Sequence, residues 1–420
     1  MSSSISNEAN GQNSYQRVAQ DEAAANESEM TTDYTSLPNA LAAKRTLSNF
    51  VAMSALFSAN HGCVVSCLAL ASSRLGTTGA WQSGILMIAY AASSLLGATY
   101  AVKTLGARNA LILGMGSYCL YVGCFYVATI LGDEHPDQQA SAAYLGAALG
   151  GIGAGVLWTG QGTYFGLASQ EYSSQLQISV TESNAKLAGY HAFLYLAEEL
   201  VMRMLSSVLL EFEIASWETI FGIYTVVAVG STLAMPFIYD YRKPDADDDD
   251  SSAFRKATVA AELLRYDPKM KHMIGFNALF GFASAFLNSY VNGQVLPVAL
   301  DDPDSKYVGI LASTVSIVAA VASLLFGKLG SNERNNSIIL ILGSLCFGGV
   351  VLPFLFQPDA SRYGWIAILG VYCLHGIGRA TFEGAWRSTF ADYFSYEKEG
   401  AFANIILQNG VASGVGYICT

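Results

Sequence analysis

The chain of 420 residues is 52% hydrophobic and only 13% charged, about half of the roughly 25% charged share that is usual in soluble domains. So little polar surface excludes an ordinary soluble enzyme or nucleic-acid-binding protein, and it predicts an all-α polytopic protein of the lipid bilayer. The net charge of -11 lies largely in two polar segments and identifies no charged partner.

Two polar segments and two groups of apolar runs divide the chain. Residues 1–43 are rich in Ser, Asn, Ala and acidic side chains without apolar periodicity, and we expect a disordered tail. Residues 44–239 form a predicted bundle of six spans, residues 240–271 an acidic linker, and residues 272–420 a second bundle. The expected spans cover about 47–70, 80–101, 110–131, 140–168, 187–210, 217–239, 272–300, 307–326, 337–357, 363–390 and 401–420. A six-plus-six bundle needs a twelfth span, which predicts that the sequence is truncated after Thr420.

The placement of Lys and Arg predicts the orientation. If the N-terminus is cytoplasmic, nearly all basic residues between the spans fall on the cytoplasmic side, and the opposite loops are mostly acidic. We therefore expect a multi-pass integral membrane protein with a cytoplasmic N-terminus. The sequence does not identify the organelle.

Two Gly-rich apolar segments resemble each other, GGIGAGVLWTGQGTYF in the fourth span and GIGRATFEGAWRSTF in the tenth. Their superposition aligns Gln161 with Glu383 and Tyr164 with Trp386. This similarity predicts a duplicated bundle whose halves meet at these two helices. The alternative is a chance match, because Gly and aromatic residues are common in membrane helices.

Polar side chains inside the spans are the candidates for function, because their burial in lipid is costly. They concentrate in the first, fourth, seventh and tenth spans, whereas the third, sixth and ninth are almost free of strongly polar side chains. This division predicts four helices around a central cavity. The candidate residues for the cavity, for substrate or for coupling are Asn60, His61, Trp158, Gln161, Asn277, Asn288, Asn292, Arg379 and Glu383.

The charged residues of the tenth span allow two interpretations. Arg379, Glu383 and Arg387 recur every four residues, which predicts one stripe on a helix. Arg379 and Glu383 fit a structural ion pair that locks the two halves, and they equally fit a substrate site facing water. On the fifth span, Glu199 and Arg203 form another possible pair.

The uncharged candidates also have structural interpretations. His61 fits an interhelical hydrogen bond, and the Asn series fits helix–helix contacts. The seven cysteines lie in expected helices and are interpreted as buried apolar residues. No nucleophile–base or metal-ligand spacing occurs, and the Gly-x-Gly strings lack a preceding strand. We therefore expect neither an enzyme nor a cofactor or metal site.

Residues 66–127 are similar to the N-terminal region of the uncoordinated-93-like proteins, a branch of the major facilitator superfamily. The shared pattern is SGILMIAYAASSLLGATYAVKTLGARNALILGMGSYCLYVGCFY, and LWTGQGTY in the fourth span is similar to that family's signature. The superfamily's usual cytoplasmic motif is degenerate here, with Ala101 in place of its Asp, and the charged tenth span departs from close family members. The resemblance implies a two-lobed bundle of twelve helices.

The resemblance implies two functions of different kinds. One is transport of a small solute or ion by alternating access, and the other is regulation or trafficking of a channel or receptor through binding to another membrane protein. The degenerate motif favours the second function, and the charged stripe of the tenth span favours the first. We expect a transporter, with the regulator as the alternative.

Overall fold

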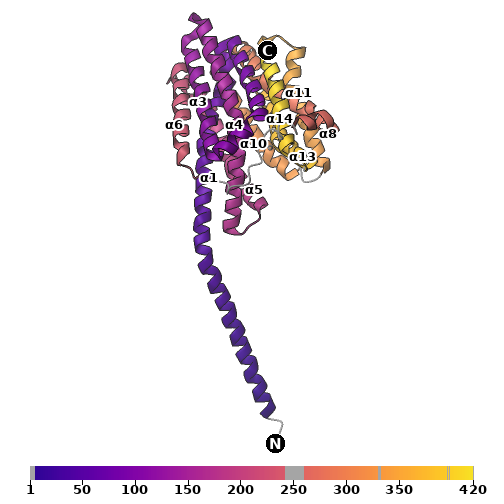
Figure 1. Cartoon of the computed structure of the whole chain (residues 1–420). Helices are drawn as coiled ribbons and strands as arrows, with labels where there is room; N and C mark the ends of the chain where they lie inside the picture. The colour runs from indigo at the N-terminus through magenta and orange to yellow at the C-terminus, as the bar shows by residue number, and fades with distance from the viewer. Residues whose placement is uncertain (1–4, 242–259, 330–332, 395, 397, 420) are drawn as a thin grey trace.

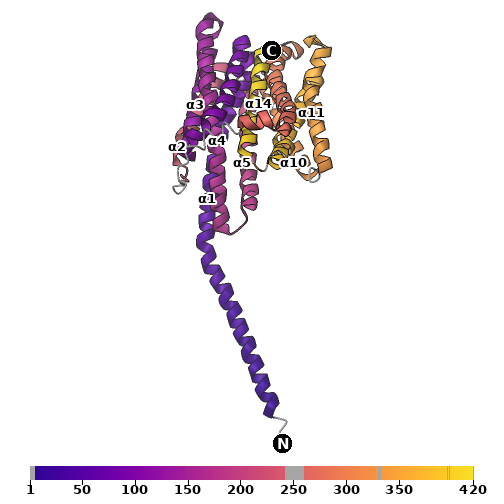
Figure 2. The same ribbon diagram turned by 45° about the vertical axis from the view of Figure 1, so that its right-hand side comes forward.

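The computed structural model describes residues 5–241, 260–329, 333–394, 396 and 398–419, with side chains from Asn39 onward apart from isolated positions. Over these residues the chain is helical and contains no strands. Its body consists of two helical halves that lie side by side, and the first helix extends far below them (Figures 1 and 2). The all-α fold expected from composition is confirmed.

The N-terminal half contains the first six expected spans. Its elements are α1 (Ile5–Leu96), α2 (Ala98–Leu105), α3 (Ala107–Leu131), η1 (Gly132–Glu134), α4 (Pro136–Leu176), α5 (Val180–Glu211), α6 (Trp217–Ala234) and η2 (Met235–Phe237). The first helix holds two spans, because Gly76 has φ 53° and ψ -130° and reverses the chain direction there. Glycine adopts this conformation without the steric cost that a side chain would bring.

The C-terminal half contains the remaining expected spans. Its elements are α8 (Pro268–Phe286), η3 (Leu287–Val295), α9 (Leu296–Ala299), α10 (Val308–Leu329), α11 (Glu333–Phe356), η4 (Ala360–Arg362), α12 (Trp365–Thr381), η5 (Phe382–Trp386), α13 (Arg387–Tyr393) and α14 (Lys398–Cys419). Both η3 and η5 are π-helical, so the seventh and tenth spans each contain a widened turn.

The two polar segments of the sequence are only partly described. The backbone of α1 is helical from Ile5, whereas composition predicted a disordered tail over residues 1–43. The Ala, Glu and Gln residues of this segment favour helix, and its proline comes late, at Pro38. Disorder of the tail in solution stays a prediction. Of the expected linker, residues 242–259 lie outside the described residues, and residues 260–266 are helical.

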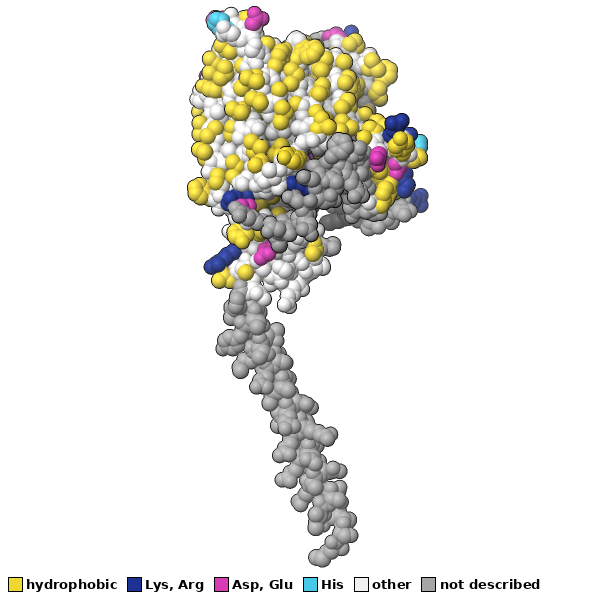
Figure 3. Space-filling model, viewed as in Figure 1, with side chains coloured by type: hydrophobic (Ala, Val, Ile, Leu, Met, Phe, Trp, Pro, Cys, Tyr) yellow, Lys and Arg dark blue, Asp and Glu magenta, His cyan; other side chains and the backbone are white. Residues whose placement is uncertain are grey.

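Hydrophobic side chains cover the body of the molecule in a broad belt, and charged side chains gather at its two ends (Figure 3). In the described ranges, eight helical segments are long and apolar enough to cross a membrane, and one of them, Asn39–Leu96, contains the first two spans. The helices α5 and α14 are not among the eight, because charged, amide and Gly residues lower their hydropathy. The chain is an integral, multi-pass membrane protein.

Small residues bring the two halves into close contact. A Cβ on Gly309 of α10 would lie 2.2 Å from the carbonyl oxygen of Arg203 on α5. A Cβ on Gly84 of α1 would lie 3.2 Å from the carbonyl oxygen of Gly414 on α14. Small residues of this kind let helix backbones approach each other in membranes. These contacts surround a central cavity between the halves.

Candidate functional site

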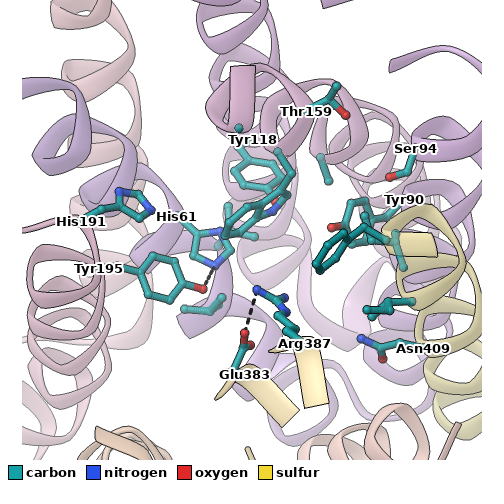
Figure 4. A pocket seen from close by; sticks show the side chains of 18 of the residues that line it. His61, Tyr90, Ser94, Tyr118, Thr159, His191, Tyr195, Glu383, Arg387 and Asn409 are labelled. Atoms are coloured by element: carbon teal, nitrogen blue, oxygen red, sulfur yellow. Dashed lines mark hydrogen bonds and ion pairs between the residues drawn. The ribbon is translucent and has the colours of Figure 1, made fainter. Parts of the chain in front are cut away.

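A cavity of about 1800 Å³ lies between the two halves of the bundle. The helices α1, α3, α4 and α5 line it from one side, and α8, α10, α12 and α14 line it from the other. The lining is mostly apolar but carries polar, aromatic and charged side chains that converge on the hollow (Figure 4). They include His61, Tyr90, Tyr118, Trp158, Tyr195, Ser284, Asn288, Arg379, Glu383, Arg387 and Asn409.

An aromatic cluster forms the N-terminal wall of this cavity. The Tyr195 hydroxyl lies 2.9 Å from Nε2 of His61, and their rings stack with centroids 5.2 Å apart. The Trp158 ring meets the His61 ring edge-on at 5.3 Å and the Phe57 ring at 5.1 Å. Tyr118 lies 5.9 Å from His61, ring to ring. We call His61, Tyr118, Trp158 and Tyr195 the aromatic cluster. Of these, His61 and Trp158 are candidates from the sequence.

A second histidine, His191 on α5, contacts the same wall. Its Nδ1 lies 3.1 Å from the Ser54 hydroxyl, and its Nε2 lies 3.3 Å from the amide nitrogen of Gln161. His191 lines the cavity, whereas Gln161 is buried behind it. Gln161 therefore contacts a side chain of the cavity wall without lining the cavity itself. Sequence analysis missed His191 and Tyr195, although they precede Glu199 and Arg203 at intervals of four residues on one helix.

A charged cluster joins the two halves behind the cavity. The Arg379 guanidinium on α12 donates two hydrogen bonds to the Glu199 carboxylate on α5, at 2.7 and 3.0 Å. Arg203 forms a second ion pair with the same carboxylate at 2.9 Å, as its spacing predicted. The Ser316 hydroxyl on α10 also donates to Glu199 at 2.9 Å. Glu199 is only 1% exposed, and Arg379 is 14% exposed.

The expected pairing of Arg379 with Glu383 is wrong. Glu383 instead pairs with Arg387 at 3.0 Å, and these side chains are 39% and 48% exposed, respectively, in the cavity (Figure 4). The physical reason is the Glu199 carboxylate on α5, which accepts two hydrogen bonds from Arg379 and is only 1% exposed. Glu383 pairs instead with the more exposed Arg387, four residues further along the chain. Arg379 consequently faces α5.

The asparagine series divides between cavity and helix packing. Asn288 lines the cavity. Asn60 donates to the carbonyl oxygen of Ala228 at 3.1 Å, and Asn277 donates to Gln408 at 2.7 Å. Asn292 donates to the carbonyl oxygen of Ala69 at 2.8 Å and accepts from Tyr372. These three amides are fully buried and hold helices together.

In each half, one of the two aromatic residues that the repeat aligns forms a hydrogen bond with an asparagine. In the N-terminal half, Asn49 of the first span donates to the Tyr164 hydroxyl at 2.6 Å. In the C-terminal half, the Trp386 indole donates to Asn277 of the seventh span at 2.7 Å. Tyr164 and Trp386 are the residues that the sequence repeat aligned. In both halves, the aligned aromatic residue thus forms a hydrogen bond with an asparagine of the first span of its own half.

The cavity extends to one end of the bundle and is closed at the other. Its lining includes Lys103, Asp240 and Phe402, which lie at the end that carries the N-terminus and the linker. At the opposite end, the hydroxyls of Ser72 and Ser289, one from each half, lie 3.1 Å apart. No cluster of three or more His, Cys, Asp or Glu side chains in the described part of the chain is arranged to hold a metal ion.

Comparison with known proteins agrees with this architecture. UNC93-like protein 3 of Arabidopsis thaliana is 22% identical over 346 residues, which are 79% of this chain and 71% of that protein. Protein unc-93 homolog A of Bos taurus is 24% identical over 192 residues, which are 44% of this chain and 40% of that protein. The similarity to proteins with these names confirms the resemblance noted in the sequence.

Solved structures share the fold at low sequence identity. A mutant of the nucleoside transporter NupG matches with a TM-score of 0.66 and 14% identity, over 89% of this chain and 90% of that one. The xylose transporter XylE from E. coli matches with a TM-score of 0.61 and 12% identity, over 90% of both chains. A family model described as Major Facilitator Superfamily matches residues 46–418. The chain belongs to the major facilitator superfamily.

Proposed function

We propose that this protein transports a small organic solute across a membrane by alternating access. The observation that carries the proposal is the cavity of about 1800 Å³ between the two halves, which reaches one end of the bundle and is closed at the other. A static scaffold has no need of a hollow of this size at the depth of the bilayer. Rocking of one half against the other would expose the same side chains to the opposite side.

The orientation and the site are part of this proposal. The excess of Lys and Arg at the open end supports a cytosolic position for that end and for the N-terminus. The aromatic cluster, Asn288, Arg379 and Glu383 are the side chains that would contact solute. Transport of this kind uses no covalent chemistry, so we propose no enzymatic activity.

The alternative function, regulation of another membrane protein, drew support from the degenerate cytoplasmic motif. That support is weaker in the folded chain. Ala101 stands in place of the motif's acid, but Arg108 of the same loop pairs with Asp240 at the end of the sixth span, at 3.2 Å. The start of α3 is therefore joined by an ion pair to the segment that follows η2, with Asp240 as the acid in place of the motif's own.

A reversible cross-link tests transport by alternating access. In a chain whose seven native cysteines are replaced, Ser72→Cys and Ser289→Cys together would form a disulfide at the closed end. Proteoliposomes are incubated with a defined metabolite mixture, and their contents are measured by mass spectrometry. We expect solute uptake that oxidation stops and reduction restores, with each single cysteine variant unaffected by oxidation. Uptake equal to that of empty liposomes, or uptake that continues in the fully cross-linked protein, would contradict the proposal.

A further inference from the structure

The buried charged cluster carries more positive than negative charge. One carboxylate, Glu199, neutralises two guanidinium groups, Arg203 and Arg379. The nearby Glu383 has its own partner in Arg387. The ion pairs of Arg203 and Arg379 among the described residues go to Glu199 and not to its neighbour Glu198. The group of Glu199, Glu383 and the three arginines therefore has a surplus of one positive charge.

A surplus charge inside a membrane protein is costly unless water or a counter-ion balances it. Arg379 is the member of the cluster that reaches the cavity wall, where 14% of its side chain is exposed. Its guanidinium has five N–H groups, and Glu199 accepts hydrogen bonds from two of them. A planar guanidinium binds carboxylates and other oxyanions with two parallel hydrogen bonds. The missing negative charge can therefore come from a ligand in the cavity.

The surroundings of Arg379 indicate the rest of such a ligand. Arg379 lines the same cavity as His61 and Tyr195 of the aromatic cluster. The rings of this cluster lie 5 to 6 Å apart, centroid to centroid, and they face the same hollow as Glu383 and Arg387 (Figure 4). Aromatic faces pack against flat rings. They also attract cations, but a cation at this position would be repelled by Arg379.

We propose that the cavity binds small aromatic oxyanions, carboxylates above all, with the anionic group on Arg379 and the ring against the aromatic cluster. This substrate class rests on the proposed transport function. It concerns binding, however, and is therefore measured separately from transport. The isosteric pair benzoate and benzamide tests the charge, because the two molecules differ little in size and shape. Benzylamine supplies the matching cation.

Binding is measured on the full-length chain in lipid nanodiscs, by thermal stabilisation and by isothermal titration. We expect benzoate to bind at least about 10-fold more tightly than benzamide, and benzylamine to bind more weakly than either. Equal affinities for benzoate and benzamide, preference for benzylamine, or absence of benzoate binding at millimolar concentrations would each overturn the proposal.

Two substitutions assign the anion to Arg379. Arg379→Gln removes the surplus charge and leaves Glu199 paired with Arg203, so the chain should fold. We expect it to lose the preference for benzoate over benzamide, while Arg379→Lys keeps a preference of reduced size because lysine binds as a point charge. Arg362→Gln, an exposed arginine outside the cavity, is the matched control and should bind benzoate normally. Unchanged benzoate preference in folded Arg379→Gln would overturn the assignment.

An uptake measurement separates this inference from the transport function. Benzenesulfonate is the probe, because it stays ionised and does not cross lipid bilayers unaided. If liposomes with the protein accumulate neutral metabolites but benzoate does not bind, transport stands and the substrate class is wrong. If benzoate binds through Arg379 but neither benzenesulfonate nor any other solute accumulates, the anion site stands and transport is wrong. Arg379-dependent accumulation of benzenesulfonate supports both.

Discussion

Arg379 and Glu199 are 180 residues apart in sequence, and they form a two-pronged ion pair across the interface of the two halves. The pair connects α5 with α12. Arg203 and Ser316 bind the same Glu199 carboxylate. Glu199 is thus the single acid on which a buried contact between the halves depends. Its position makes the consequences of substitution predictable.

Glu199→Gln is expected to destabilise the folded protein. The glutamine leaves Arg203 and Arg379 as two buried guanidinium groups without a counter-charge. Removal of one partner from a buried ion pair typically costs about 3–5 kcal/mol. Folded yield is measured by size-exclusion chromatography and stability by thermal unfolding. The neighbouring substitution Glu198→Gln is the control, and equal behaviour of the two variants would contradict a central role for Glu199.

Glu383→Gln is expected to fold normally. Glu383 and Arg387 are both more than a third exposed in the cavity, and ion pairs in such surroundings contribute about 0–1 kcal/mol. Thermal unfolding in detergent should therefore be close to that of the unchanged protein. If Glu383 handles solute or protons, transport by this variant should nevertheless change. A large loss of folded protein would show that Glu383 has a structural role.

Gly309→Val should weaken the contact between the halves. A Cβ at this position would lie 2.2 Å from the carbonyl oxygen of Arg203, a backbone atom that cannot turn away. The substitution therefore pushes α10 from α5 and favours opening of the closed end. The measurement is labelling of Ser289→Cys by a water-soluble maleimide, in a chain without native cysteines. Gly230→Val, with no atom within 4 Å of its Cβ, is the control and should leave labelling unchanged.

Thiol labelling should also distinguish the asparagines of the seventh span. A cysteine at Asn288 is expected to react with water-soluble reagents, because this residue lines the cavity. A cysteine at Asn292 should react slowly, because that side chain is fully buried between Ala69 and Tyr372. Rapid labelling at Asn292 would mean that the cavity extends further toward the closed end than the structure shows.

The orientation of the chain is tested by tags. We expect a tag at Met1 and a tag within residues 245–252 to face the cytosol, because the basic residues crowd that side. Both positions lie outside the described residues. Protease protection in sealed membrane vesicles reports the side of each tag. Tags on opposite sides would contradict an even number of spans between them.

Much of the helical framework could be predicted from the sequence, because each membrane span must satisfy its own backbone hydrogen bonds and so leaves a long apolar run. The distribution of polar side chains among the spans also predicted a central cavity, which α4 and α12 line. The halves meet mainly at other helices, where α1 packs on α14 and α5 on α10. The partner of Arg379 could not be predicted in the same way. Spacing of four residues pointed to Glu383, but its partner Glu199 is 180 residues away on another helix, and only the packing of the two halves brings them together.

The cavity wall contributed by α5 was the other gap in the prediction. Its residues His191 and Tyr195 were hidden because α5 is less apolar than the other spans and its polar residues suggested a separate ion pair. The position of an asparagine within a predicted span, in turn, does not reveal whether its side chain faces water or a neighbouring helix. The difference between Asn288 and Asn292 therefore required the positions of the packed helices.

The π-helical turns η3 and η5 give the seventh and tenth spans a swivel at the depth of the cavity. A π turn holds about one residue more than an α turn, and one residue corresponds to roughly 100° of rotation about a helix axis. Rewinding η5 as α-helix would therefore turn α13 against α12 and lengthen the span by about 1.5 Å. Arg387 would move to another side of the span while Arg379 stayed in place. Twisting within one helix would thus add a second degree of freedom to the proposed rocking of whole halves.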